Sequence, residues 1–248
     1  MNAIILAAGI GKRLRPLTTD KPKTLINLDG KTILEYICCN LASVEIRKAY
    51  VVLGHAKEKV IEYAKYIEKK LGMRFVFVEN RIFEQSNTGY SLLLALERLK
   101  ETQNDVIIVN GDIIFDFKIL LRLMERENTA IVVDNVKKLT KESFKVQTKN
   151  GRIVNMGKEI EISQADGEYI GLAKIRRGDV DVFFKVLEKN VRNDINTYYD
   201  YAFVGISKYT NVDIVYTNGL KWTEIDFFED LQYAKEIIRE ISKGRKCT

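Results

Sequence analysis

The chain has 248 residues, of which 46% are hydrophobic and 30% charged, a composition typical of a folded protein without long disordered segments. Its 40 Lys and Arg residues exceed its 34 Asp and Glu residues and give a net charge of +6, but no basic tract carries the interleaved aromatics that a nucleic-acid groove needs. We therefore expect phosphorylated small molecules as partners, and no nucleic acid. Three cysteines without disulfide or metal-ligand spacing favour a reducing cytoplasm, and no stretch has the pattern of a signal peptide or a membrane span.

The first half of the chain alternates buried strands with helices. Continuous apolar runs predict strands buried on both faces, and longer periodic runs between them predict helices. This alternation indicates βαβ units and a mainly parallel sheet flanked by helices, which is an α/β fold. The strands are expected at 3–8, 49–54, 74–79, 105–110 and 129–134, and the helices at 33–42, 57–71, 91–100 and 117–126.

The pattern changes after residue 134. Asn150-Gly151 predicts a two-residue turn between antiparallel strands, and Asn218-Gly219 predicts a second hairpin, which joins strands at 212–217 and 220–226. Further helices are expected at 179–191 and 227–243. The second half should therefore pack onto the first as a small antiparallel lid over a substrate.

The strongest chemical signal is the run LAAGIGKRLRPLT at 6–18, followed by KPKTLI at 21–26. Directly after a buried strand, Gly9 and Gly11 leave the backbone open, so that its N–H groups can approach phosphate oxygens. Arg13 and Lys23 then bring two cations that can neutralise charge on a departing pyrophosphate. Each element alone also suits an ordinary glycine turn with solvated basic residues. The compound run favours a triphosphate site in which Arg13 and Lys23 are catalytic.

Two carboxylates stand at the ends of separate predicted strands. Asp112 follows the run VIIVNG, and Asp226 ends the strand before the last predicted helix. Ligand crevices form at the carboxyl ends of strands in open α/β sheets, and carboxylate oxygens are ligands that Mg²⁺ prefers. Asp112 and Asp226 are thus the predicted metal ligands, with Mg²⁺ as the cofactor. The structural alternatives are a turn residue for Asp112 and a helix N-cap for Asp226.

Taken together, these runs resemble the sugar-phosphate nucleotidyltransferases and the related phosphocholine and inositol-phosphate cytidylyltransferases. The resemblance extends over nearly the whole chain and includes NTGYSL (87–92), VNGDIIFD (109–116), GEYIG (167–171) and WTEIDFFEDL (222–231). It implies a Rossmann-like fold in which the acceptor's phosphate attacks the α-phosphorus of a nucleoside triphosphate and pyrophosphate leaves. It also implies one nucleotidyltransferase domain over 1–248, with a nucleotide-binding core at 1–134 and an acceptor-binding part with a closing helix at 135–248.

The resemblance also extends the predicted site beyond the charged residues. Three of the implied nucleotide-binding residues precede a helix, from which a side-chain amide and free N–H groups can reach the base, although helix capping by Thr88 or Ser91 is the alternative. The nucleotide-binding set is Leu6, Ala7, Ala8, Gly9, Gly11, Lys12, Gln85, Thr88 and Gly89. The set expected to bind the acceptor is Lys158, Glu168, Gly171, Tyr199 and Asp200.

The head group of the acceptor is left open by the sequence. If the acceptor carries a quaternary or primary amine, Tyr199 can supply a ring face and Asp200 a counter-charge. Inositol phosphate would need hydroxyl-binding groups instead, and the sequence does not decide between these acceptors. The structural alternative for Tyr199 is an ordinary helical turn with this residue in the core. Trp222 is expected either to pack against the head group of the acceptor or to pack the second hairpin onto the core. Phe227 is expected to pack within the protein and not to stack on a base.

Departures from the sugar-phosphate pattern at Lys12, Asn27 and Thr32 favour the short cytidylyltransferases, so CTP is the preferred donor. The alternative enzyme is a sugar-1-phosphate uridylyl-, thymidylyl- or guanylyltransferase. A non-catalytic nucleotide-binding regulatory homologue is a third hypothesis, and the joint presence of two cations and two metal carboxylates speaks against it. The expected acceptor is a small phosphorylated alcohol or phosphonate, and a homodimer is an assembly that the sequence allows.

Overall fold

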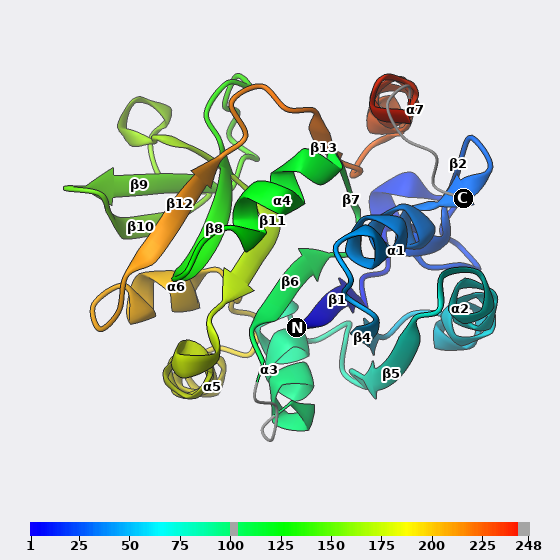
Figure 1. The fold of residues 1–248 in the computed structure, drawn as a ribbon, viewed down its shortest axis with the longest axis horizontal. Coiled ribbons are helices and arrows are strands. Elements are labelled where there is room, and N and C mark those ends of the chain that lie inside the picture. The colour runs from blue at the N-terminus through cyan, green and yellow to red at the C-terminus, as the bar shows by residue number, and fades with distance from the viewer. Residues whose placement is uncertain (100–103, 243–248) are drawn as a thin grey trace.

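The computed structural model describes residues 1–99 and 104–242. Its framework is a nine-stranded mixed sheet, in which strands of both halves of the chain take part (Figure 1). The strands are β1 (Asn2–Ala7), β4 (Lys48–Leu53), β5 (Arg74–Glu79), β6 (Val106–Asn110), β8 (Thr129–Asp134), β9 (Lys145–Lys149), β10 (Arg152–Gly157), β11 (Gly167–Ile175) and β12 (Val212–Tyr216). Their order is β10-β9-β11-β6-β1-β4-β5, with β8 paired to β11 and β12 paired to β8.

The mainly parallel α/β sheet predicted from the sequence is confirmed. β1 pairs in parallel with β4 on one side and β6 on the other, and β4 pairs in parallel with β5. β11 runs antiparallel between β6 and β8, so β8 does not follow β6 directly in the sheet. Strands from either side of residue 134 therefore interleave in one continuous sheet.

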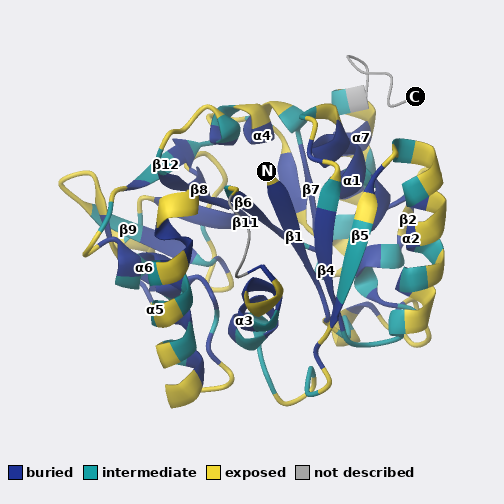
Figure 2. Ribbon diagram, turned by 60° about the horizontal axis from the view of Figure 1, so that its bottom comes forward, coloured by how far each residue is buried: buried dark blue, intermediate teal, exposed yellow. Residues whose placement is uncertain are grey.

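Two hydrophobic cores cover the two faces of the sheet, because alternate residues of a strand point to opposite faces. In β1, Ala3 and Ile5 pack into the first core, whereas Ile4 and Leu6 pack into the second. Figure 2 shows the buried strands between helices whose outer faces are exposed. The first core is closed by α1 (Ile33–Ser43), α2 (Lys57–Leu71), α4 (Phe117–Met124) and α7 (Phe228–Ser242), and the second by α3 (Thr88–Arg98), α5 (Val180–Asn193) and α6 (Tyr201–Ile206).

The predicted helices are confirmed with small changes at their ends. α3 begins three residues before the predicted start, because the Asn87 side chain accepts a hydrogen bond from the Thr88 N–H and caps the helix at that point. The predicted last residues of α3 and α7, Lys100 and Lys243, lie outside the described residues. Among the described residues, no helix combines the length and apolar character needed to cross a bilayer.

One of the two predicted hairpins forms. β9 and β10 pair antiparallel around Asn150 and Gly151, both of which have positive φ angles, as a tight Asn-Gly turn requires. Asn218 and Gly219 also turn the chain with positive φ angles, but the strands on either side do not pair with each other. The prediction of a second hairpin was therefore wrong.

The physical reason is that β12 pairs in parallel with β8 instead, and the Thr217 N–H continues this ladder by donating to the Val133 carbonyl. The chain then crosses to β13 (Trp222–Glu224), which pairs antiparallel with β7 (Ile113–Phe115) in a separate small sheet. A third sheet is formed by β2 (Asn27–Leu28) and β3 (Lys31–Thr32). The 3-10 helices of the described residues are η1 (Lys12–Leu14), η2 (Lys23–Leu25), η3 (Ile162–Gln164) and η4 (Arg177–Asp179).

Candidate active site

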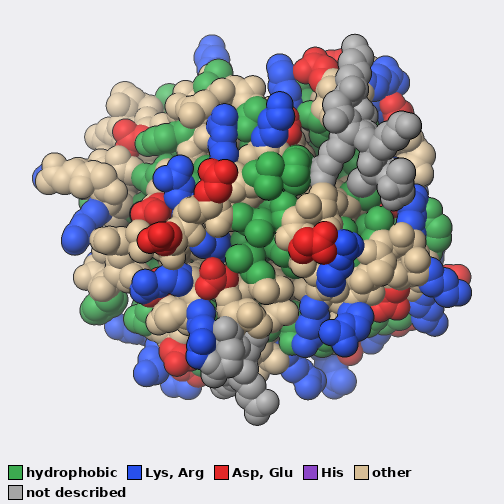
Figure 3. Space-filling model, viewed as in Figure 1, with side chains coloured by type: hydrophobic (Ala, Val, Ile, Leu, Met, Phe, Trp, Pro, Cys, Tyr) green, Lys and Arg blue, Asp and Glu red, His purple; other side chains and the backbone are tan. Residues whose placement is uncertain are grey.

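Two adjoining hollows open at the carboxyl ends of β1 and β6. The smaller, of about 260 Å³, lies over the loop after β1, and the larger, of about 610 Å³, extends between α3 and β11. Both are lined by Leu6, Gly9, Arg13, Asp112 and Asp226, so together they form one cleft. This is the edge at which open α/β sheets bind their ligands. On the described part of the face seen in Figure 3, Lys and Arg side chains are interspersed with Asp and Glu and form no continuous basic track.

The loop between β1 and η1 lies open toward the smaller hollow. Gly11 has a φ of 66°, and a Cβ atom there would lie 3.1 Å from Cγ2 of Thr18, so this turn favours glycine. Thr18 stabilises the turn, because its hydroxyl donates a hydrogen bond to the Gly11 carbonyl at 2.7 Å. A Cβ atom on Gly9 would meet nothing within 4 Å. The protein itself therefore leaves the space above Gly9 free for a ligand.

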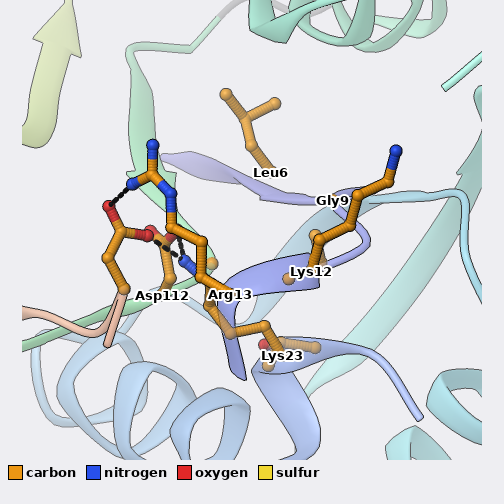
Figure 4. Close-up of a pocket in the computed structure, with 11 residues that line it drawn as sticks. Leu6, Gly9, Lys12, Arg13, Lys23 and Asp112 are labelled. Atoms are coloured by element: carbon orange, nitrogen blue, oxygen red, sulfur yellow. Dashed lines mark hydrogen bonds and ion pairs between the residues drawn. The ribbon is translucent and has the colours of Figure 1, made fainter. Parts of the chain in front are cut away.

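Opposite charges converge where the two hollows meet. The Lys23 ammonium donates to Oδ2 of Asp112 at 2.9 Å and to Oδ1 of Asp226 at 2.6 Å. Arg13 approaches Asp226 from above, with Nη1 3.4 Å from Oδ2. Figure 4 shows Arg13 and Lys23 directed toward the carboxylates, whereas the Lys12 side chain points away from them. The structure thus brings together all four charged residues that the sequence predicted for catalysis and metal binding.

These ion pairs change the acidity of both partners. Burial alone would lower the pKa of Lys23, but the charges of Asp112 and Asp226 outweigh burial and hold that pKa above its usual value. Burial would likewise raise the pKa of Asp226, but Lys23 and Arg13 hold it below the usual value. Lys23 and Asp226 are therefore charged over the whole physiological pH range.

Glu224 is a third acidic member of this cluster that the sequence reasoning missed. One carboxylate oxygen each of Asp112, Glu224 and Asp226 lies within 4.8 Å of the others. Glu224 is exposed at the surface of the cleft, but the surrounding protein limits its hydration, and with the charges of Asp112 and Asp226 this raises the pKa of Glu224 to about 8. The sequence did contain a signal for Glu224. In the run WTEID, Glu224 stands two residues before Asp226, and side chains two residues apart in a strand point to the same face.

The far end of the larger hollow combines one lysine with two buried carboxyl groups. Lys158 follows β10, and its ammonium lies 3.2 Å from Oε2 of Glu142, which also faces Arg13. Glu168 is 8% exposed, and its Oε2 atom has no hydrogen-bond partner. Asp200 is 4% exposed, and burial raises its pKa to about 7. Gly171 completes this wall.

Tyr199 does not lie where the sequence placed it. Its side chain is completely buried, and its hydroxyl donates to Oδ1 of Asn110 at 3.0 Å and bonds the Tyr169 hydroxyl at 2.8 Å. The assignment of Tyr199 to the acceptor surface was wrong, and the alternative of a core residue is confirmed. The neighbouring Tyr198, on the opposite side of the chain, lines the cleft together with Phe144 and Trp222.

Two of the three residues predicted to reach the base do not line the cleft. Gln85 is exposed outside it, and the Gly89 N–H already donates to the Thr197 carbonyl at 3.1 Å. Thr88 does line the larger hollow, beside three polar residues that the sequence reasoning missed: Asn80, Ser86 and Ser91. Asn80 donates to the hydroxyl groups of both serines at 3.0 Å, which makes a fixed polar surface.

Phe227 was expected to pack, but it lies at the mouth of the cleft. Its side chain is 44% exposed, and the Arg13 guanidinium carbon lies 5.1 Å from the centre of its ring. Trp222 lines the cleft from the other side, where its indole N–H donates to Asp134. The remaining predicted residues, Ala7, Ala8 and Lys12, line one hollow or the other.

Comparison with known proteins identifies the family of the chain. Residues 2–155 match the family model described as nucleotidyl transferase. The CTP:phosphoglutamine cytidylyltransferase of Campylobacter jejuni is 30% identical over 254 residues, which cover 94% of this chain and 98% of that protein.

Two solved structures share the fold. The inositol-1-phosphate CTP transferase from T. maritima has a TM-score of 0.82 at 23% identity and covers 99% of this chain and 98% of its own. The CTP:phosphocholine cytidylyltransferase from Streptococcus pneumoniae has a TM-score of 0.73 at 24% identity, with 96% and 98% covered. The family indicated by the sequence motifs is confirmed, and the chain belongs to the nucleotidyl transferase family.

Proposed function

We propose that the protein transfers CMP from CTP to the phosphate of a small phosphorylated alcohol, in a magnesium-dependent reaction that releases pyrophosphate. The observation that carries this proposal is the convergence of Arg13 and Lys23 with three carboxylates where the two hollows meet. The relative and the two structural neighbours are named for reactions with CTP, which favours CTP over the nucleotides of the sugar-phosphate enzymes.

The chain's own residues account for the donor side. The open loop at Gly9 and Gly11 receives the triphosphate, and Arg13 and Lys23 neutralise the negative charge that develops on the leaving pyrophosphate. An oxygen of the acceptor phosphate attacks the α-phosphorus, and the bond from that phosphorus to the bridging oxygen of the pyrophosphate breaks. No general base is required because the acceptor phosphate is already ionised, so positioning and charge neutralisation supply the rate.

The acidic cluster fits a magnesium ion. Asp112, Glu224 and Asp226 offer hard carboxylate oxygens close enough to be shared by one cation. Asp112 and Asp226 would hold the ion, with Glu224 beside them. When bound, Mg²⁺ would polarise the phosphate oxygens and neutralise part of their charge.

The base of CTP is assigned to the larger hollow between β1 and α3. Asn80, Ser86 and Ser91 line that end, and their amide and hydroxyl groups are suited to the polar edge of a base. Leu6 and Ala8 supply an apolar surface on the other side. This assignment replaces Gln85 and Gly89 as the base-binding residues.

The opposite wall of the larger hollow receives the acceptor. Three cations line the larger hollow, and because Lys137 lies over the Trp222 ring, Arg13 and Lys158 are assigned to the acceptor's phosphate. Asp200 has no ion pair among the described side chains, and Glu168 has a buried oxygen without a partner, so each of them offers a carboxyl group to an ammonium group on the acceptor. The ring of Tyr198 lines the same space, whereas the Trp222 ring already has the Lys137 ammonium 4.9 Å from its centre. An amine-bearing phosphorylated alcohol therefore fits this wall better than inositol phosphate.

The direct test is a pyrophosphate-release assay with CTP, UTP, dTTP and GTP, each paired with phosphocholine, phosphoethanolamine, inositol 1-phosphate and a hexose 1-phosphate. We expect turnover with CTP and an amine-bearing acceptor. Faster turnover of a hexose 1-phosphate with UTP or dTTP would overturn the choice of donor and acceptor. No release with any pair, together with nucleotide binding that ignores Mg²⁺, would indicate a non-catalytic homologue.

The empty space above Gly9 predicts that Gly9→Ala retains the fold but weakens donor binding. The added methyl group meets no protein atom, so it occupies only the space assigned to the triphosphate. We expect a melting temperature close to that of the wild type and a KM for CTP raised about tenfold. Gly111→Ala is the contrasting variant, because its methyl group would meet the Leu6 carbonyl in β1 and should lower the melting temperature. An unchanged KM for CTP in Gly9→Ala would contradict the assignment.

The acidic cluster predicts that Asp112→Asn lowers kcat by about a hundredfold, on the order of 3 kcal/mol, because a ligand acting in the transition state loses its charge. The fold should survive, since Asn nearly preserves the shape. The matched control is Asp116→Asn, which changes an N-cap of α4 outside the cleft and should leave turnover unchanged. Equal kcat values and equal Mg²⁺ dependence in the two variants would remove Asp112 from the active site.

Burial of Asp200 predicts a stability change with a definite pH dependence. Its pKa is about 7 in the folded chain against 3.8 for an unperturbed carboxyl, so ionisation costs stability, and the cost grows as pH rises from about 4 to 7. Asp200→Asn does not ionise and should be more stable than the wild type at pH 8, with a gap about 3 kcal/mol larger than at pH 5. Urea unfolding at both pH values measures this gap.

The same variant should lose turnover of amine-bearing acceptors while its KM for CTP stays unchanged. A stability gap that does not widen with pH would show that Asp200 is not held in the surroundings described here. Unchanged turnover of phosphocholine would remove Asp200 from the acceptor site.

A further inference from the structure

Lys145 is a buried cation whose hydrogen bonds all go to backbone carbonyls. It is the first residue of β9 and is 1% exposed, with Gly157 of β10 as its partner on one side and Glu168 of β11 on the other. Its ammonium donates to the carbonyl of Lys158 at 2.6 Å, to that of Ser143 at 3.1 Å and to that of Lys141 at 3.4 Å. An ammonium has three donors, so none is left for a substrate.

These three bonds tie together two segments that form the acceptor wall. One is the segment at 135–144 between β8 and β9, from which Glu142, Ser143 and Phe144 line the cleft. The other begins at Lys158, directly after β10. The side chains of Glu142 and Lys158 also pair across the gap, but both are substantially exposed, and such an exposed pair contributes little to holding the segments. The buried ammonium is the stronger link.

Folding alone does not account for a lysine at this position. Removing an ammonium from water costs several kcal/mol, and the neutral carbonyls around Lys145 offset only part of that cost. A methionine of similar length would fill the space without the cost of burying a charge. The positive charge does have a use in the acceptor wall, where Lys145 pairs with Glu168 across the two strands. Burial raises the pKa of Glu168, and Lys137, Ser143 and, to a smaller extent, Lys145 oppose that rise.

We propose that Lys145 is a positioning residue of the acceptor site, which fixes the backbone at Lys158 and at 141–143 so that Lys158 faces the acceptor's phosphate. The inference rests on the proposed function for the identity of the phosphate. It does not require Lys145 to touch any substrate.

The chain offers a matched control in Lys174. This lysine is 2% exposed, lies at the other end of β11, donates to the Arg126 carbonyl and is 3.7 Å from Asp105. It lines neither hollow. Lys145→Met and Lys174→Met therefore remove the same group from comparable burial, but only the first touches the acceptor wall.

The experiment measures melting temperature, KM for phosphocholine, KM for CTP, and amide hydrogen exchange in peptides that cover 135–144 and 158–166. Both variants should remain folded, which the melting temperature checks. Only Lys145→Met should raise the KM for phosphocholine, by about tenfold or more, with the KM for CTP nearly unchanged. Exchange in the two peptides should also rise only in Lys145→Met.

Equal KM values for phosphocholine in the two lysine variants, or a KM for CTP that rises in step, would overturn the proposal. If Lys145→Met does not fold, Lys145→Gln retains donor hydrogens and is judged by the same measurements. If the wild type does not turn over phosphocholine, the proposed acceptor is wrong, and the exchange experiment still decides on Lys145. Equal exchange in both peptides would then reject its positioning role.

Discussion

The charge of Lys23 is the constraint on which the cleft depends. Its ammonium bonds Asp112 and Asp226, which follow β6 and β13 and lie 89 and 203 residues away in the sequence. A partly buried cation between two carboxylates links all three segments, because both carboxylates bond the same ammonium, and loss of Lys23 would leave two like charges side by side in a poorly hydrated place. Glu224 joins the same cluster only because β13 pairs with β7 and brings its strand beside the turn at Asp112.

Local pattern was sufficient to predict most of the fold. The apolar runs and helical periods depend on neighbouring residues, so β1 and the helices that cover it could be located without any knowledge of contacts. The second hairpin failed because the Asn218-Gly219 turn is a local property, whereas strand pairing is not. The backbone groups of β12 found a partner in β8, a strand that is distant in sequence but open at one edge.

The sequence was sufficient to predict those site residues that belong to a compound motif. It was less informative where tertiary packing decides whether a side chain faces the cleft or the core. Nothing in YYDYAF distinguishes the orientation of Tyr198 from that of Tyr199, and only the bond from Tyr199 to Asn110 places one in the core and the other at the cleft. Gly89 fails as a base-binding residue for a similar reason, because the Thr197 carbonyl already occupies its N–H. Both outcomes are set by partners about a hundred residues away.

The two sides of the cleft rest on different strands, which meet where β11 pairs with β6. The donor side rests on continuous parallel strands, whereas the acceptor side rests on β11, whose pairing with β8 is interrupted between Tyr169 and Ala173. Gly171 takes a φ of 79° at this irregularity, and the Asn110 side chain packs directly against it. Asn110 therefore contacts the acceptor wall while standing two residues before Asp112. The irregularity in β11 thus places the acceptor wall directly against the strand that leads to Asp112.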